Sequence, residues 1–582
     1  MRLLNSILLM SGLVALLTAC GSGSSSKSSD GSLTGFANSQ YSHLTATAYT
    51  VCAQTKTGIL KCWGDGSSYN FANEIGDLMG DDVEEVGDGI PAAQLGDGNV
   101  EYAMAGPSFG CAIYEGGELK CWGNKSKFGM DDFTDDTSVY VGDKPGELDN
   151  NLPVINLGDD FTVKALSMGD EHACAILSND RLKCWGSNGY GRLGLGDTDS
   201  RGNNAGELGN NLPFVDLGTN ASDEPYKVKS VYAGYDRTCA ILENDQLKCW
   251  GKNNRAQAGY GDFNDRGDEP DEMGNNLPFV DLGTGRSAKQ VFAYYVHTCV
   301  ILDNDELKCW GSNDQGELGL GTGDDFVGNN LPNRRTTECG FNNLPMLYNE
   351  SQLAPGEQNC EFGGSAIPYG QDTSENGLLE EGEVLDTFVF CHAHDMQRLY
   401  SITDIAANES EECGDQTGFE VVRDFDNDGD GLLGDGSQNF MGDALPTIDF
   451  GSESAVVDVA QGDDHTCALL ADTTLKCWGD NGEAQHGIDS QESEFGGAAN
   501  EIPAAQTEVD LGEGLYAVAI TGGYDFTCAL LNNDDIKCWG YDNDSATLGV
   551  AEYLDEYIGN GDPQPEMGDA LKPVLLFETD AQ

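Results

Sequence analysis

The sequence predicts an all-β fold, a seven-bladed β-propeller of four-stranded blades. All seven tryptophans stand in the sequence Cys-Trp-Gly, and each of these Cys residues has a second Cys ten residues before it. Most of these units follow one another at intervals of about 60 residues. A repeated unit of this length, rich in short strands and turn residues, is typical of a propeller blade. The chain is therefore an array of one unit.

Each unit is expected to contain a β-hairpin. In residues 174–186, two short apolar runs flank a three-residue polar turn, which is a hairpin signal. The last turn position is occupied, unit by unit, by Gly58, Gly117, Asp180, Asp245, Asp305, Thr473 and Asp534. Gly and Asp tolerate the positive φ that such a turn needs, whereas the β-branched Thr473 fits least well.

The hairpin places the two Cys of a unit opposite each other. A directly opposed pair has a Cα separation of about 4.5 Å, which a disulfide can bridge. The pairs are Cys52–Cys62, Cys111–Cys121, Cys174–Cys184, Cys239–Cys249, Cys299–Cys309, Cys467–Cys477 and Cys528–Cys538. In an exported protein we expect disulfides, each contributing about 2–3 kcal/mol, and the alternative is seven pairs of buried thiols.

Two further runs complete the four strands of a unit. A Pro-led run such as 210–218 recurs between hairpins, and a lead-in run such as 163–172 precedes the first Cys. The first unit has no Pro-led run before it, while the last unit is followed by one at 572–577. We therefore expect this C-terminal strand to complete the first blade and to close the ring.

The third unit carries a pattern of glycines and polar residues around its hairpin. Its members are Gly169, His172, Cys174, Ala175, Cys184, Trp185, Gly186, Asn188, Gly191, Leu193, Gly194 and Gly196. In this pattern the chain resembles the regulator of chromosome condensation repeat family, which forms seven-bladed propellers. The resemblance covers most of residues 41–332 and 437–582, although the first and seventh units lack most of the later glycines.

The resemblance implies little about function, because one fold hosts many functions. The founder of the family is a nuclear exchange factor that binds chromatin, and another member is a secreted bacterial propeller that inhibits β-lactamases. This chain has 99 acidic and 30 basic residues and a net charge of −69. Nucleic-acid binding is therefore not expected, since phosphate contacts need basic patches. The acidic surface suits a saline habitat or dependence on divalent cations.

The N-terminus has the features of a bacterial lipoprotein signal. A short apolar run reaches Leu17 and is followed by Thr18, Ala19 and Cys20. The run is too short to span a bilayer comfortably. We expect a signal peptide over residues 1–19, lipidation of Cys20 and a flexible Ser/Gly-rich tether over residues 20–40. Gly21 after the Cys favours an outer-membrane lipoprotein, periplasmic or surface-exposed.

The array is interrupted between the fifth and sixth hairpins. Propeller blades are expected over 41–332 and 437–582, and residues 333–436 form an insertion or a degenerate extra repeat. The insertion contains Cys339, Cys360, Cys391 and Cys413, which allow two disulfides in three pairings. The extra repeat would place a hairpin from Cys391 to Ser401.

The end of the insertion matches a calcium-loop template. Carboxylates at alternating positions converge on a hard cation, and Gly429 permits the sharp turn. The candidate calcium ligands are Asp424, Asp426, Asp428, Asp430 and Asp435. An acidic turn without a cation is the alternative, since the blade pattern resumes at once and no flanking helices are evident.

No catalytic motif is found, and we do not expect an enzyme. His172, His297 and His465 share one repeat position and are expected to be packing or hydrogen-bonding residues. His392 and His394 could share a strand face, although a transition-metal site there is less expected than a structural strand. The sequence contains no nucleophile elbow, phosphate loop or zinc-protease helix motif.

The function that the sequence favours is a lipid-anchored envelope propeller that binds another envelope or extracellular protein. Long acidic loops such as 262–272 would supply specificity on a rigid scaffold. The alternatives are a calcium-stabilised structural or adhesion component of the cell surface, and a propeller enzyme acting on polysaccharide. No cofactor other than calcium is expected, and the lipid anchor is the expected membrane contact.

Overall fold

The computed structural model describes residues 39–576 with gaps. The gaps are 83–84, 86–88, 129–137, 205, 322–325, 328–345, 349–350, 354–363, 372–383, 392–440, 491, 498–500, 543–544, 551–556 and 562–564. The chain divides into two compact units, residues 1–331 with 437–582, and residues 332–436. No helix among the described residues is long and apolar enough to cross a membrane.

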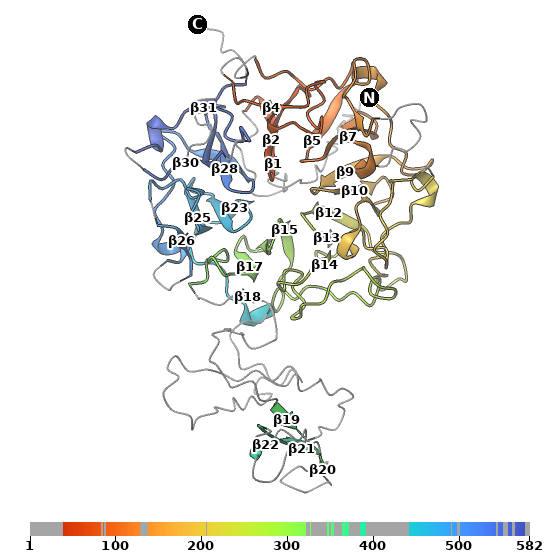
Figure 1. The fold of residues 1–582 in the computed structure, drawn as a ribbon, viewed down its shortest axis with the longest axis vertical. Coiled ribbons are helices and arrows are strands. Elements are labelled where there is room, and N and C mark those ends of the chain that lie inside the picture. The colour runs from red at the N-terminus through yellow and green to blue at the C-terminus, as the bar shows by residue number, and fades with distance from the viewer. Residues whose placement is uncertain are drawn as a thin grey trace, which may run out of the picture. The chain divides into compact units, whose positions relative to one another are not determined.

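The larger unit is a ring of seven blades (Figure 1). Each blade has an inner lead-in strand followed by the two arms of the predicted hairpin, paired antiparallel. In chain order the strands are β1 (Tyr41–Thr47), β2 (Thr50–Thr55), β3 (Leu60–Asp65); β5 (Val100–Ala105), β6 (Phe109–Tyr114), β7 (Glu118–Asn124); β9 (Val163–Met168), β10 (His172–Leu177), β11 (Leu182–Gly186); β12 (Val228–Ala233), β13 (Arg237–Leu242), β14 (Leu247–Gly251); β15 (Ala288–Phe292), β16 (His297–Leu302), β17 (Leu307–Ser312); β23 (Val456–Gln461), β24 (His465–Leu470), β25 (Leu475–Asp480); and β27 (Ala517–Gly522), β28 (Phe526–Leu531), β29 (Ile536–Tyr541).

The fourth strand of a blade consists of two short segments on the outer side of the second hairpin arm. The first segment is β4 (Leu78–Met79), β8 (Tyr140–Val141), β18 (Phe326–Val327), β26 (Glu494–Phe495) or β30 (Tyr557–Ile558), and a single bridge replaces it in blades three and four. The second segment is the Pro-led run, which pairs near the start of the same arm, as Ala92 does with Lys61. The predicted seven-bladed propeller of four-stranded blades is confirmed.

The Pro-led run belongs to the hairpin that precedes it. The prediction that residues 572–577 complete the first blade is wrong, because β31 (Pro573–Val574) pairs with β29 of the last blade. The physical reason is that the run follows its own hairpin through one loop, so that it pairs locally. The C-terminal strand does reach the first blade, since Lys61 Nζ donates to the Leu576 carbonyl.

The hairpins have the predicted register and turn geometry. In all seven, the two Cys are directly opposed and joined as a disulfide, with Cα separations of 4.0–4.1 Å. The last turn residue has a positive φ in every hairpin, including 76° at Thr473. The predicted pairs are thus confirmed, and Thr473 adopts the backbone conformation that suits it least.

Buried tryptophans join six of the blades to the blade before them. All seven indole rings are fully buried, and all except that of Trp185 donate their N–H to a carbonyl in the loop that follows the preceding hairpin. The pairs, with N···O distances, are Trp63 with Thr547 (3.0 Å), Trp122 with Asn70 (2.6 Å), Trp250 with Arg192 (3.0 Å), Trp310 with Gln257 (3.2 Å), Trp478 with Glu317 (2.8 Å) and Trp539 with Gln485 (2.9 Å). The first of these bonds closes the ring.

A lysine that precedes the second Cys of every unit makes a second contact between blades. Lys248 Nζ, for example, donates to Leu217 O of the preceding blade at 2.9 Å and to Gly274 O of its own blade at 2.8 Å. Six of the seven expose 7% or less of their surface: Lys61, Lys183, Lys248, Lys308, Lys476 and Lys537. This lysine recurs in every unit, although it was not among the predicted site residues.

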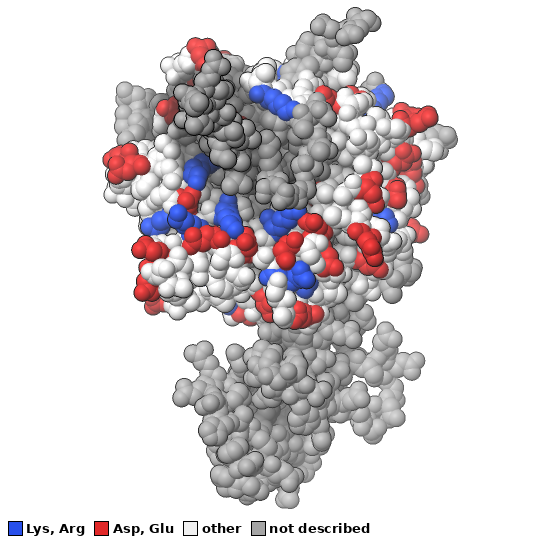
Figure 2. Space-filling view, turned by 180° about the vertical axis from the view of Figure 1, so that it is seen from behind, with Lys and Arg blue, Asp and Glu red and all other residues white. Residues whose placement is uncertain are grey.

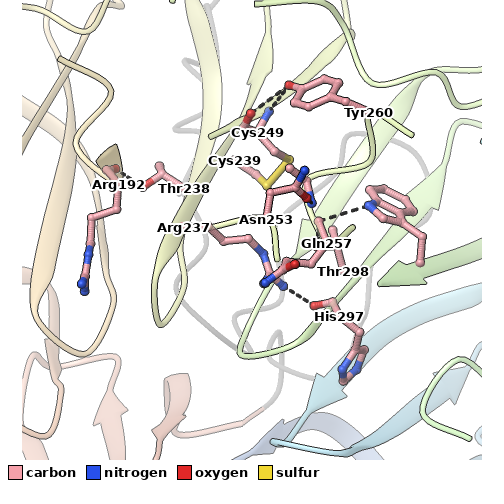
Figure 3. Close-up of a disulfide and its surroundings, with 12 residues drawn as sticks. Arg192, Arg237, Thr238, Cys239, Cys249, Asn253, Gln257, Tyr260, His297 and Thr298 are labelled. Atoms are coloured by element: carbon pink, nitrogen blue, oxygen red, sulfur yellow. Dashed lines mark hydrogen bonds between the residues drawn. A yellow bond between two sulfur atoms is a disulfide. The ribbon is translucent and has the colours of Figure 1, made fainter. Parts of the chain in front are cut away.

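The predicted histidines also link blades. His172, His297 and His465 each make a hydrogen bond through Nε2 to the threonine before the first Cys of the next blade, at 2.8–3.0 Å. Burial lowers the pKa of His297 and of His465 to about 3. In blade four this position holds Arg237, which donates to the His297 carbonyl (Figure 3). These residues have the structural role that the sequence predicted.

The smaller unit is a separate sheet. It contains β19 (Met346–Tyr348), β20 (Ser351–Leu353), β21 (Gly364–Gln371) and β22 (Val384–Cys391), in the order β19-β21-β20 with β22 paired to β21. This arrangement favours an inserted subdomain over a degenerate blade, and residues 392–401 of the expected extra hairpin lie outside the described residues. The insertion interrupts blade five, because β18 precedes it and Ile448 N bonds to Leu307 O after it, at 2.9 Å.

Candidate functional site at the propeller axis

The turn between the lead-in strand and the first hairpin arm lies at the inner end of every blade. Two residues of each turn come to the end of the ring axis. They are Ala48 and Tyr49, Pro107 and Ser108, Asp170 and Glu171, Tyr235 and Asp236, Tyr295 and Val296, Asp463 and Asp464, and Tyr524 and Asp525. Tyrosines and carboxylates dominate these positions in six of the seven blades.

Neighbouring turns touch through their backbones. Tyr235 N donates to Tyr294 O at 3.0 Å, and Tyr524 N donates to Ala48 O at 3.0 Å. A Cβ atom added to Gly169 would lie 1.9 Å from the Gly234 carbonyl oxygen. Glycine is therefore required at residue 169, where this turn approaches the next, and we call the set of turns the inner rim.

Four tyrosine rings follow one another across this rim. The Tyr49 and Tyr524 rings stack with centroids 5.6 Å apart, and those of Tyr295 and Tyr524 are 6.2 Å apart. Tyr235 meets Tyr295 edge to face at 4.7 Å. These four residues are half-buried. We call them the tyrosine rim, which presents amphipathic rings from blades one, four, five and seven on one surface.

Carboxylates lie beside the tyrosine rim, some with a cationic partner and some without one. Asp236 is paired with Arg192 at 2.8 Å and with Lys252 at 3.1 Å. Asp170 and Asp463 have no cationic side chain within 4.0 Å among the described residues. Burial, reinforced by neighbouring carboxylates, raises the pKa of Asp170 to about 7 and that of Asp463 to about 8.

Burial of the repeated lysine leaves the exterior more acidic than the composition suggests. Six of the 30 Lys and Arg residues are used inside the ring by the inter-blade lysines alone. The basic side chains visible in Figure 2 lie interspersed with Asp and Glu and form no separate basic patch. The described residues on the face drawn in Figure 2 therefore show no basic surface of the kind that phosphate binding requires.

The other predicted site residues fall outside the axial site. Cys20 and residues 1–38 lie outside the described residues, as do the candidate calcium ligands Asp424 to Asp435 and the pair His392 and His394. Within the described part of the chain, no group of three His, Cys, Asp or Glu side chains is placed to hold a metal ion. Lipidation and calcium binding therefore stay predictions.

The long acidic loops that were expected to give specificity form hydrogen bonds and ion pairs within themselves. In the loop 262–272, Asp262 pairs with Arg266 at 2.5 Å, and Glu272 accepts the N–H groups of Gly267 and Glu269. The axial tyrosines were not predicted because they follow the lead-in run, which was expected to be one strand. Their signal is a Tyr or Asp four residues before the first Cys in five units, and Tyr49 stands three residues before its Cys.

Family models match both units of the chain. The regulator of chromosome condensation (RCC1) repeat matches residues 163–192, 228–257, 288–317, 456–485 and 517–545. These segments fall on blades three to seven and run from the lead-in strand to the loop after the hairpin. A separate domain of unknown function matches residues 347–391, the strands of the smaller unit.

Several known proteins are similar to the chain. The human X-linked retinitis pigmentosa GTPase regulator is 27% identical over 191 residues, which are 32% of this chain and 16% of that protein. The ultraviolet-B receptor UVR8 of Arabidopsis thaliana is 24% identical over 401 residues, 68% of this chain and 80% of the receptor. The match to the dog GTPase regulator, 30% identical, covers 27% of this chain and 14% of that protein.

Among solved structures, Prp20p from Saccharomyces cerevisiae aligns with 87% of this chain and 84% of its own, with 12% identity and a TM-score of 0.46. The Cys-Trp-Gly hairpins, the closed ring and the five matched segments agree with one another. This chain is a seven-bladed β-propeller in which blades three to seven match the regulator of chromosome condensation repeat.

Proposed function

We propose that this protein is a lipid-anchored envelope propeller that binds another protein through the tyrosine rim and does not act as an enzyme. The observation that carries the proposal is the line of four half-buried tyrosines across the axial end of the ring. Tyrosine is enriched at the centres of protein interfaces, because it offers a large contact area with little conformational entropy to lose. Unpaired carboxylates next to the rim favour a basic partner.

The repeat family and the N-terminal sequence support the two halves of the proposal. Prp20p has been studied for its binding to Gsp1p and histones, so a related propeller binds proteins. Seven disulfides fit an oxidising compartment, and the lipoprotein signal ending at Cys20 fits attachment to the outer membrane. The acidic exterior fits a partner with a basic face.

Capture from solubilised envelope tests the proposal. The mature propeller is expected to retain one partner in stoichiometric amount, and the double variant Tyr295→Ala, Tyr524→Ala is expected to lose it. Tyr516→Ala is the matched control, because this tyrosine is 41% exposed and lies outside the axial turns. Equal retention by the wild type and the double variant would show that the rim is not the binding surface.

A further inference from the structure

Two buried arginines donate hydrogen bonds to the tyrosine rim from the blade before it. Arg192 of blade three exposes 6% of its surface, and Arg237 of blade four exposes 1%. Arg192 Nη1 donates to the backbone carbonyl of Tyr235 in blade four at 3.1 Å. In the same way, Arg237 Nη1 donates to the carbonyl of Tyr295 in blade five at 2.8 Å. Each of the two tyrosines whose rings meet edge to face is therefore held by one guanidinium.

Arg237 departs from the pattern of its repeat position. The equivalent residues of blades three, five and six are histidines, and their Nε2 atoms bond to a threonine in the hairpin of the next blade. The longer Arg237 side chain donates to the carbonyls of Tyr295 and His297, and the second of these bonds is drawn in Figure 3. The exchange of His for Arg thus moves this link between blades from the hairpin arm to the turn of the inner rim.

Arg192 departs from its repeat position in a similar way. The residues at this position in blades four to six accept a backbone N–H of their own loop through the side chain, and they are Gln257, Glu317 and Gln485. Arg192 keeps one bond to its own loop, from Nε to Gly189 O at 3.1 Å. Its Nη atoms reach across the blade boundary to Tyr235 O and, as an ion pair, to Asp236 at 2.8 Å.

Charged donors distinguish this half of the tyrosine rim from the other half. Hydrogen bonds from an ionised donor are about twice as strong as neutral ones. The carbonyls of the other two rim tyrosines accept backbone N–H groups, Tyr49 from Asp65 at 2.8 Å and Tyr524 from Asp463 at 3.2 Å. The turns of blades four and five are therefore expected to open less often than those of blades seven and one.

We infer that Arg192 and Arg237 are positioning residues, which hold Tyr235 and Tyr295 as the rigid anchor of the proposed interface. A side chain that is already fixed loses less conformational entropy when a partner binds, and binding energy concentrates in such aromatic residues. The partner therefore gains most of its affinity over blades four and five. The role in binding rests on the proposed function of the rim, whereas the rigidity does not.

Hydrogen–deuterium exchange of the whole propeller, with reduction after the quench and peptide mass spectrometry, tests the rigidity without a partner. Arg237→His and Arg192→Gln introduce residues that other blades carry at these positions, so both variants are expected to fold. Exchange is expected to become about tenfold to a hundredfold faster over residues 292–297 in Arg237→His and over 232–236 in Arg192→Gln. Residues 46–50 and 522–526, which form the turns of blades one and seven, should exchange as in the wild type.

Arg266→Gln is the matched control, because this arginine donates within its own loop, to Asn264 O and Asp265 O. The rim turns of this variant should keep the wild-type exchange rate. Unchanged exchange at the rim turns in both test variants would overturn the positioning role. A uniform rise around the whole ring would overturn it as well, since an arginine that only stabilises the fold acts on all blades alike.

The release of the protein that the wild type captures from solubilised envelope tests the role in binding. Arg237→His is expected to release it about tenfold faster, whereas Arg266→Gln should release it at the wild-type rate. Faster exchange with an unchanged release rate would overturn the role in binding. Faster exchange together with capture of no protein, even by the wild type, would defeat the proposed function and leave the positioning of the two tyrosines standing.

Discussion

The ammonium group of Lys61 in the first blade donates a hydrogen bond to the backbone carbonyl of Leu576, 515 residues later in the last blade. The other buried inter-blade lysines make the same bond between neighbouring blades, as Lys183 does to Leu157 O at 2.7 Å. The first and the last blade therefore meet through a contact that is repeated around the ring. Together with the indole bond from Trp63 to Thr547 at 3.0 Å, it closes the propeller without exchange of a strand.

Replacing the closing lysine is expected to destabilise the ring. Lys61→Met removes a charged donor from a buried carbonyl, and we expect a loss of about 1.5–3 kcal/mol. Lys289→Met is the control, because its ion pair with Asp305 is partly exposed and contributes about 0–1 kcal/mol. Denaturant unfolding of the two variants and the wild type measures the difference. Equal stability of the two variants would contradict the role of Lys61.

Glu317 is expected to destabilise the folded protein, in contrast to the residues at the same position of other blades. Its Oε1 atom is unpaired and fully buried, and burial raises the pKa of this carboxyl well above its usual range. A raised folded-state pKa means that stability is lost as the pH rises. Gln257 and Gln485 occupy the same position in blades four and six.

Glu317→Gln should therefore raise the free energy of unfolding at pH 8 by about 1–3 kcal/mol. The gain should disappear near pH 4, where the carboxyl is protonated in both states. Gln257→Glu should have the opposite effect at pH 8. Thermal melts of the three proteins from pH 4 to 8 measure this, and a pH-independent difference would show that the carboxyl charge is not the cause.

The backbone of Thr473 is strained in the hairpin turn of blade six. A β-branched residue at a φ of 76° is unfavourable, and glycine removes the clash. Thr473→Gly should stabilise the protein by about 1 kcal/mol, after the greater freedom of glycine in the unfolded chain is subtracted. Asp534→Thr, at the same position of the last blade, should lose a similar amount. Chemical denaturation gives both values, and a loss of stability in Thr473→Gly would refute the argument.

Asp463 is expected to make the stability fall as the pH rises from about 4 to about 8. Burial, then Asp464 and Asp525, raise its pKa to about 8, while Arg255 and the Tyr524 side chain act in the other direction. The unfolded carboxyl titrates near 3.9, so the folded protein holds this proton more tightly and loses stability as the pH rises through 8.

Asp463→Asn should therefore have a free energy of unfolding at pH 8.5 that is about 1–3 kcal/mol higher than that of the wild type, and the difference should be smaller at pH 5. Scanning calorimetry in an amine-free buffer measures the effect. The buried histidines act in the opposite direction below pH 6.5, because their lowered pKa values oppose protonation of the folded state. A wild type that is more stable at pH 8.5 than at pH 6.5 would contradict the prediction.

The propeller should fold without its insertion. On either side of residues 332–436, blade five is anchored to β17, through Val327 opposite Gly311 and through Ile448 bonded to Leu307. Replacement of 332–436 by a short Gly/Ser linker should leave one cooperative transition within a few degrees of the wild type. Loss of that transition, or of the blade-five disulfide in peptide mapping, would show that the insertion is needed for folding.

The sequence predicted the blades because their signals are local. Cys pairs ten residues apart, turn residues and Pro-led runs each report on hairpin and strand within a few residues of one another. The assignment of Pro573 to the first blade failed because nothing in a short apolar run says which of two adjacent arms it will pair with. The axial site could not be predicted for a related reason. Tyr49, Tyr295 and Tyr524 come from blades far apart in the chain, and only closure of the ring brings them together.

Each blade except blade five is a contiguous stretch of chain that holds its own disulfide and its own outer strand. An in-frame duplication or deletion of one such stretch would add or remove a whole wedge and leave no neighbour with a missing strand. The gene can therefore change the number of wedges, or accept foreign sequence between two outer segments, in a single step. Blade five holds such a sequence between its two outer segments, and both segments still pair with β17.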